Sequence, residues 1–78
     1  MTSFEANAIV EKCRTMCETI HGSEVNDEML YSWTMEAARQ AERNAFRNRN
    51  DFYAHHQTLE CCKTLKTCLK ELSRRRSS

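Results

Sequence analysis

Apolar residues in the first part of the chain recur with the period of an α-helix rather than that of a β-strand. At about 100° per residue, two glutamates lie opposite an apolar face. That face consists of Ala6, Ile9, Cys13, Met16, Cys17 and Ile20. Thr2 and Glu5 fit a capping box at its start, and Gly22 suits the left-handed residue that often ends a helix. The pattern predicts an amphipathic helix over about residues 3–20.

A second helical pattern follows, and it is rich in alanine. Asn26 is a favourable N-cap, and Val25 and Leu30 have the spacing of a hydrophobic staple around it. The predicted apolar face consists of Leu30, Thr34, Ala37, Ala38, Ala41 and Ala45. Because alanine has little bulk, the backbone of a neighbouring helix can approach this face closely. The pattern predicts a helix over about residues 27–47.

The polar stretch RNRND, at residues 47–51, is the weakest region for helix, since Asn and Asp favour caps and turns. Asn50 or Asp51 is suited to cap a third helix, predicted over about residues 51–73. Its apolar face consists of Ala54, Thr58, Cys61, Cys62, Leu65, Cys68, Leu69 and Leu72. No proline or glycine forces a break, however. One long helix over about residues 27–73 is the alternative, and it would have to dimerise to bury its apolar stripe.

The composition favours an all-α fold, because the chain has no proline, one glycine and many good helix formers. We expect a small three-helix bundle or helical hairpin, with a short first helix packed on two longer ones. This single domain would span residues 1–74, and residues 75–78 would form a frayed basic tail. A chain of 78 residues supports only a marginal core, so we expect an oligomer, in the simplest case a homodimer, to complete it. The hypothesised oligomer interface consists of Trp33, Ala37, Ala41 and Ala45.

The sequence contains no sign of membrane insertion or export. No apolar run approaches the roughly 20 residues of a membrane span, and the first residues lack the basic start and apolar stretch of a signal peptide. The five cysteines are an odd number, which disfavours a complete set of disulfides. We therefore expect a cytoplasmic protein whose thiols are reduced.

Histidines and cysteines gather in the last third of the chain, at His55, His56, Cys61 and Cys62, and invite a reading as metal ligands. Their spacing does not suit one site on a helix, because convergent side chains lie three, four or seven residues apart. Only His55 and Cys62 meet that condition. We expect the cysteines to be buried apolar side chains, although thiols of the first and third helices can still meet across the core. No cofactor, metal or catalytic site is predicted, and the protein is expected not to be an enzyme.

The charges are unevenly distributed, which is the clearest functional signal in the sequence. Residues 1–38 have two basic and seven acidic side chains, whereas residues 39–78 have ten basic and four acidic ones. The predicted contact surface on the later helices consists of Arg39, Arg43, Arg47, Lys63, Lys66, Lys70 and Arg74. The leading hypothesis is a regulatory module that binds a protein partner as an inhibitor or adaptor. The alternative is a binder of nucleic acid or a small phosphorylated ligand.

Overall fold

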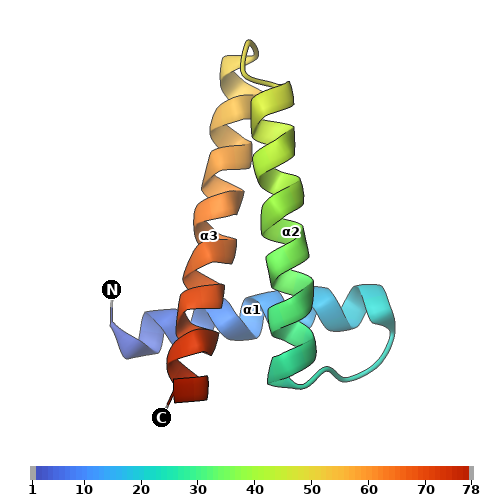
Figure 1. Ribbon diagram of the computed structural model, residues 1–78, viewed down its shortest axis with the longest axis vertical. Coiled ribbons are helices and arrows are strands. Elements are labelled where there is room, and N and C mark those ends of the chain that lie inside the picture. The colour runs from blue at the N-terminus through green and yellow to red at the C-terminus, as the bar shows by residue number, and fades with distance from the viewer. Residues whose placement is uncertain (1, 78) are drawn as a thin grey trace.

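The computed structural model describes residues 2–77, which form three α-helices and no β-strand. They are α1 (Ser3–His21), α2 (Asp27–Arg47) and α3 (Phe52–Ser77). Helices α2 and α3 form an antiparallel hairpin, and α1 lies across its lower end (Figure 1). The all-α prediction and its three-helix form are confirmed, and α1 and α2 begin and end within one residue of the predicted bounds.

Side-chain caps explain why the helices begin where they do. Thr2 Oγ1 accepts a hydrogen bond from the Glu5 N–H at 3.2 Å, and Asn26 Oδ1 accepts one from the Met29 N–H at 2.8 Å. Asp51 Oδ1 accepts from the N–H of the residue three positions later, at 3.2 Å. These bonds satisfy backbone donors that have no partner within the helix. A turn before Asp51 separates α2 from α3, so the single long helix is excluded.

The core lies between the two hairpin helices and under the middle of α1. Its buried apolar members are Val10, Cys13, Cys17, Val25, Leu30, Ala38, Ala41, Ala45, Cys62, Leu65, Cys68 and Leu72. Ala38, Ala41 and Ala45 of α2 belong to this set because α2 packs against α3 within the same chain. Their small side chains let the two long helices pack closely.

The transverse position of α1 corrects two sequence predictions. Cys61 was expected in the core, but it is exposed, because α1 covers only the lower part of the hairpin (Figure 1). Met16 and Ile20 were expected on the buried face of α1, and both are exposed. Only the middle of that face, around Val10 and Cys17, lies against the hairpin, and the prediction had omitted Val10 from the face.

The C-terminal end of α3 also differs from the prediction, because the helix continues through Ser77 and not only to about residue 73. Arg75 donates a hydrogen bond to Asn7 Oδ1 at 2.6 Å and lies 3.6 Å from a carboxylate oxygen of Asp27. The Arg76 guanidinium lies over the Tyr31 ring, 5.0 Å from its centroid. These contacts with α1 and α2 extend the last helix, which is why local sequence gave no sign of its length. Residue 78 lies outside the described residues.

Candidate contact surfaces

The predicted basic surface is exposed but divided by carboxylates. Glu36 lies 3.7 Å from both Arg39 and Arg43. Lys63 lies 3.5 Å from a carboxylate oxygen of Glu60. Because four acidic residues in total are inserted among the seven basic ones, this side of the protein is mixed in charge. It is therefore a weaker attractor of phosphate than the sequence suggested.

Two further ion pairs of the predicted surface shift the pKa of the groups involved, and one of them joins two helices. Lys66 lies 3.0 Å from Glu42, linking α3 to α2, and its pKa is raised because the Glu42 carboxylate accepts a hydrogen bond from it. Arg74 donates to the carboxylate of the buried Glu71, and this hydrogen bond lowers the pKa of Glu71. Arg47 and Lys70, the two remaining members of the predicted surface, are exposed.

The end of the hairpin farthest from α1 combines arginines with exposed aromatic rings. We call this the tip surface, and it consists of Arg43, Phe46, Arg47, Arg49, Phe52 and Tyr53. The exposed fraction is 69% for Phe46, 88% for Phe52 and 70% for Tyr53. These residues lie at the same end of the molecule because α2 ends and α3 begins there (Figure 1). The sequence shows them as neighbours, but only the fold shows that no other helix covers them.

Contacts within the tip surface hold some of these side chains in place. The Arg49 guanidinium lies 4.4 Å from the centroid of the Phe46 ring, a cation–π arrangement. Arg49 also donates a hydrogen bond to the Phe46 carbonyl at 3.0 Å. The rings of Phe52 and His56 stack with centroids 6.4 Å apart. Part of the tip surface is therefore ordered before any partner binds, which lowers the entropy cost of binding.

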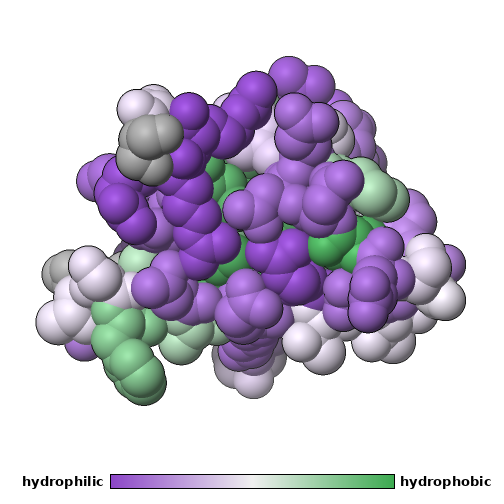
Figure 2. Space-filling model, turned by 90° about the horizontal axis from the view of Figure 1, so that it is seen from below, coloured by the Kyte–Doolittle hydropathy of each residue, from purple (hydrophilic) through white to green (hydrophobic). Residues whose placement is uncertain are grey.

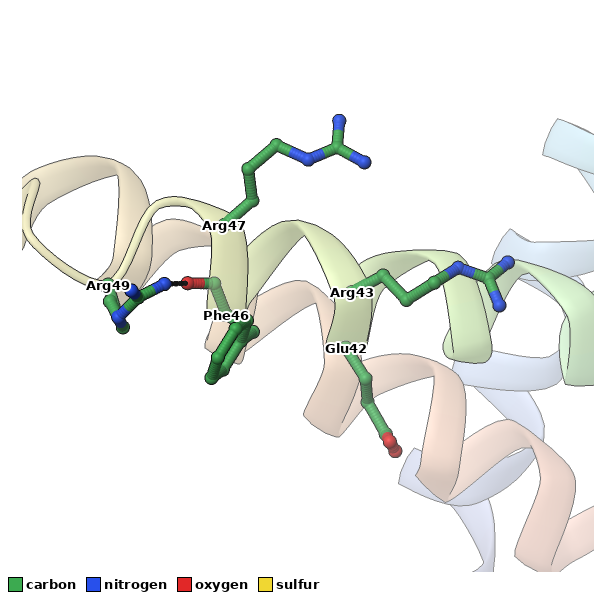
Figure 3. Close-up of a pocket in the computed structure, with 5 residues that line it drawn as sticks. All are labelled: Glu42, Arg43, Phe46, Arg47 and Arg49. Atoms are coloured by element: carbon green, nitrogen blue, oxygen red, sulfur yellow. Dashed lines mark hydrogen bonds between the residues drawn. The ribbon is translucent and has the colours of Figure 1, made fainter.

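A hollow of about 530 Å³ lies beside Phe46, and its other lining residues are Glu42, Arg43, Arg47 and Arg49. Figure 3 shows that the side chains of Arg43, Arg47 and Glu42 point in different directions along α2. The guanidinium groups do not converge on one point, as they would in a built phosphate site. The hollow is thus part of a broad surface rather than an enclosed ligand pocket.

A second exposed apolar area lies on α1. Met16 and Ile20 are one helical turn apart on the flank that the hairpin leaves uncovered, and the partly buried Ile9 lies on the same side. We call these three residues the α1 flank. Figure 2, which views the molecule from below, shows small apolar areas separated by a largely hydrophilic surface. Exposed apolar side chains at this end are therefore limited in extent.

The hypothesised oligomer interface on α2 is only partly accessible. Ala41 and Ala45 are buried within the single chain, so they are not available to contact a second copy. Trp33 and Ala37 are partly buried against the core. In the single chain, the face of α2 that holds Ala41 and Ala45 is therefore part of the core.

The histidine and cysteine cluster does not form a metal site within residues 2–77, where no group of three or more suitable side chains meets. His55 Nδ1 is 2.8 Å from the Ala45 carbonyl. A carbonyl only accepts, so the ring N–H donates to one of the last carbonyls of α2, which lacks a partner in its own helix. His55 is thus accounted for as a structural residue.

A polar clamp that the sequence analysis missed fixes α1 to the start of α2. Arg14 donates to the Val25 carbonyl at 2.8 Å and to the carboxylate of Asp27, and Glu18 accepts from the Val25 N–H at 3.0 Å. The hydrogen bond with Asp27 raises the pKa of Arg14, and the same bond lowers the pKa of Asp27. The only local signal was a basic residue beside the apolar face of α1.

Comparison with known proteins adds no relative: no protein-family model, curated protein or solved structure matches the chain. Among the described helices, none is both long enough and apolar enough to cross a membrane. The tip surface and the α1 flank are therefore the features from which a function can be inferred.

Proposed function

We propose that the protein is a non-enzymatic binding module that contacts a protein partner through the tip surface and changes that partner's activity. The observation that carries the proposal is the exposure of three aromatic rings beside three arginines at one end of a small domain. Aromatic residues and arginine are enriched where protein interfaces gain most of their binding free energy. Large apolar side chains that are exposed together at one end of a small protein are also typical of an interaction site.

The charge of the tip surface defines the partner's chemistry. The tip surface has three basic side chains, those of Arg43, Arg47 and Arg49, and the acidic side chains near them in the sequence are Glu42 and Asp51. Glu42 is already paired with a lysine of α3. The complementary surface would have an apolar centre for the rings and an acidic rim for the guanidinium groups. The divergent arginines of Figure 3 suit such a broad surface better than a small anion.

This proposal is tested by comparing which proteins bind to the immobilised wild type, to a tip variant and to a control variant. The tip variant carries Phe46→Ser and Phe52→Ser, and the control carries Phe4→Ser, which removes an exposed ring from α1 at the other end of the molecule. Proteins held by the wild type and by the control, but lost from the tip variant, would support the proposal. Equal retention on all three chains would contradict it.

The second candidate function is binding of single-stranded nucleic acid, because exposed rings next to arginines also stack with bases and contact phosphates. Fluorescence anisotropy with a labelled oligonucleotide separates the two candidates. Binding that weakens steeply with salt and is lost in Arg43→Glu would favour nucleic acid. No binding at low salt would leave the protein partner as the sole candidate.

We also propose that two copies associate through the α1 flank, since a chain this small gains stability by covering exposed apolar side chains. Light scattering should give a mass above the 9.2 kDa of one chain. Ile20→Glu should return the protein to a monomer without unfolding it, because Ile20 is exposed. A wild-type monomer at high concentration would be incompatible with this association.

A further inference from the structure

The apolar side chains of the α1 flank point along the hairpin toward its tip. The opposite side of α1 is marked by Asn7, Arg14 and Glu18, which all bind residues near the end of α3 or the start of α2. At about 100° per residue, the α1 flank lies on roughly the other side of the α1 axis. Its side chains therefore face the part of the hairpin that α1 leaves uncovered.

Helix α1 covers one end of one side of the hairpin (Figure 1). On α3 that side is marked by Arg75, which binds Asn7 of α1, and the residues 11, 14 and 18 positions earlier share its direction. On α2 the opposite side is marked by Glu42, because it binds Lys66, which lies about 180° around α3 from Arg75. Residues of α2 that lie roughly opposite Glu42 are therefore on the side of α1. We call the stretch beyond α1 the open hairpin side, and it consists of Trp33, Ala37, Asn44, Gln57, Cys61 and Thr64.

The open hairpin side contains no charged residue, although 29% of the chain is charged. The Thr64 hydroxyl already donates to the Glu60 carbonyl at 3.3 Å, so covering it would leave no hydrogen bond unmade. Charged residues border the α1 flank only on its outer edge, away from the hairpin, at Glu5 and Lys12. An uncharged centre with a polar rim is the composition of a protein interface.

The α1 flank and the open hairpin side together form a corner that is large enough for a stable contact. Helix α2 has 21 residues, which make a length of about 32 Å, and α1 covers about 10 Å of that length. The rest of the two-helix side and the flank of α1 offer on the order of 700 Å². A standard interface buries about 800 Å² on each partner, and the three side chains of the flank alone would fall far short of it.

We propose that a second copy of this chain occupies the corner, so that one two-fold contact covers the α1 flank and the open hairpin side together. This contact is the association through the α1 flank proposed above, extended onto the hairpin, and it exists only if that association does. In a two-fold contact the same surface of both copies meets. A charged surface would repel its own copy, whereas the uncharged open hairpin side does not. Cys61 and Gln57, exposed in the single chain, are covered in the pair.

Cys61 reports on this contact, because the other four cysteines are buried. Iodoacetamide should alkylate Cys61 in the folded chain, and the rate should fall at least about tenfold as the protein concentration rises through the range in which light scattering shows pairing. Ile20→Glu, which breaks the pair, should react at the fast rate at every concentration. Phe4→Ser is the matched control, because Phe4 is exposed on another side of α1, and this variant should behave as the wild type.

A charge on the open hairpin side gives a second test. Gln57→Glu, at an exposed position, should raise the dissociation constant of the pair at least about tenfold, because it places a charge in an uncharged contact. Ser32→Glu, exposed on the outer side of α2, should leave that constant unchanged. A pair in which Cys61 stays reactive, or which Gln57→Glu forms as well as the wild type, would overturn the covering of the hairpin and leave the association itself standing. A monomer at every concentration would overturn both.

Discussion

Replacing Arg14 by methionine tests whether the polar clamp holds α1 on the hairpin. Methionine keeps most of the apolar length of the side chain and removes the guanidinium. The Arg14 side chain is only 18% exposed and contacts the Val25 carbonyl, Asp27 and Glu11. The substitution would leave the Val25 carbonyl, at 2.8 Å in the native clamp, without its charged donor.

The expected cost follows from these contacts. A hydrogen bond from a charged group to a buried acceptor contributes about 1.5–3 kcal/mol. The pairs with Asp27 and Glu11 add less than about 1 kcal/mol each, because both carboxylates are substantially exposed and solvent screens them. We expect the free energy of unfolding to fall by about 2–3 kcal/mol. A domain of this length has a total of about 4–12 kcal/mol, so the loss is a large share.

Circular dichroism at increasing temperature and urea measures this loss. The melting temperature should fall by about 10–20 °C, and the urea midpoint by about 2–3 M if the m-value is near 1 kcal/mol/M. Arg39→Met is the matched control, because Arg39 is exposed and lies 3.7 Å from its partner Glu36. That change should cost less than about 0.5 kcal/mol. Equal stability of the two variants would refute the assignment of Arg14 as the clamp.

Three further predictions concern pH, the core and the last helix. The pKa values of Asp27 and Glu71 are lowered in the folded protein from ordinary values of 3.8 and 4.5. The contribution of the two carboxylates to stability is therefore complete above about pH 5 and is lost as pH falls through the lowered pKa values. Thermal melts of the wild type at acid pH should show this loss of stability, and an unchanged stability from pH 5 to 2 would contradict it. Leu72→Ala should cost about 2–5 kcal/mol because Leu72 is buried, whereas Ile20→Ala, at an exposed position, should cost under about 1 kcal/mol in urea melts of the monomer. Deletion of residues 74–78 should lower the melting temperature, because Glu71 would keep its buried position without its arginine partners; an unchanged melting temperature would restore the prediction of a frayed tail.

The fold was largely predictable from the sequence, whereas the candidate surfaces were predictable only in part. Helix bounds follow from periodicity and from caps such as Asn26, whose effects act over a few residues. The basic residues were placed on exposed faces correctly, but their pairing across helices, as between Lys66 and Glu42, depends on how α2 and α3 align. In the sequence, the tip surface appears only as aromatic residues on either side of the RNRND stretch. Its exposure depends on where α1 packs.

The sequence by itself determined that this chain is all-α and, to within one residue, where α1 and α2 begin and end. The tertiary structure decided which part of each apolar face is covered. Because α1 crosses the hairpin at one end, Cys13 and Cys68 are buried while Cys61 stays exposed. That crossing position results from many weak contacts between residues distant in the chain, such as the one between Arg75 and Asn7, and no local pattern contains them.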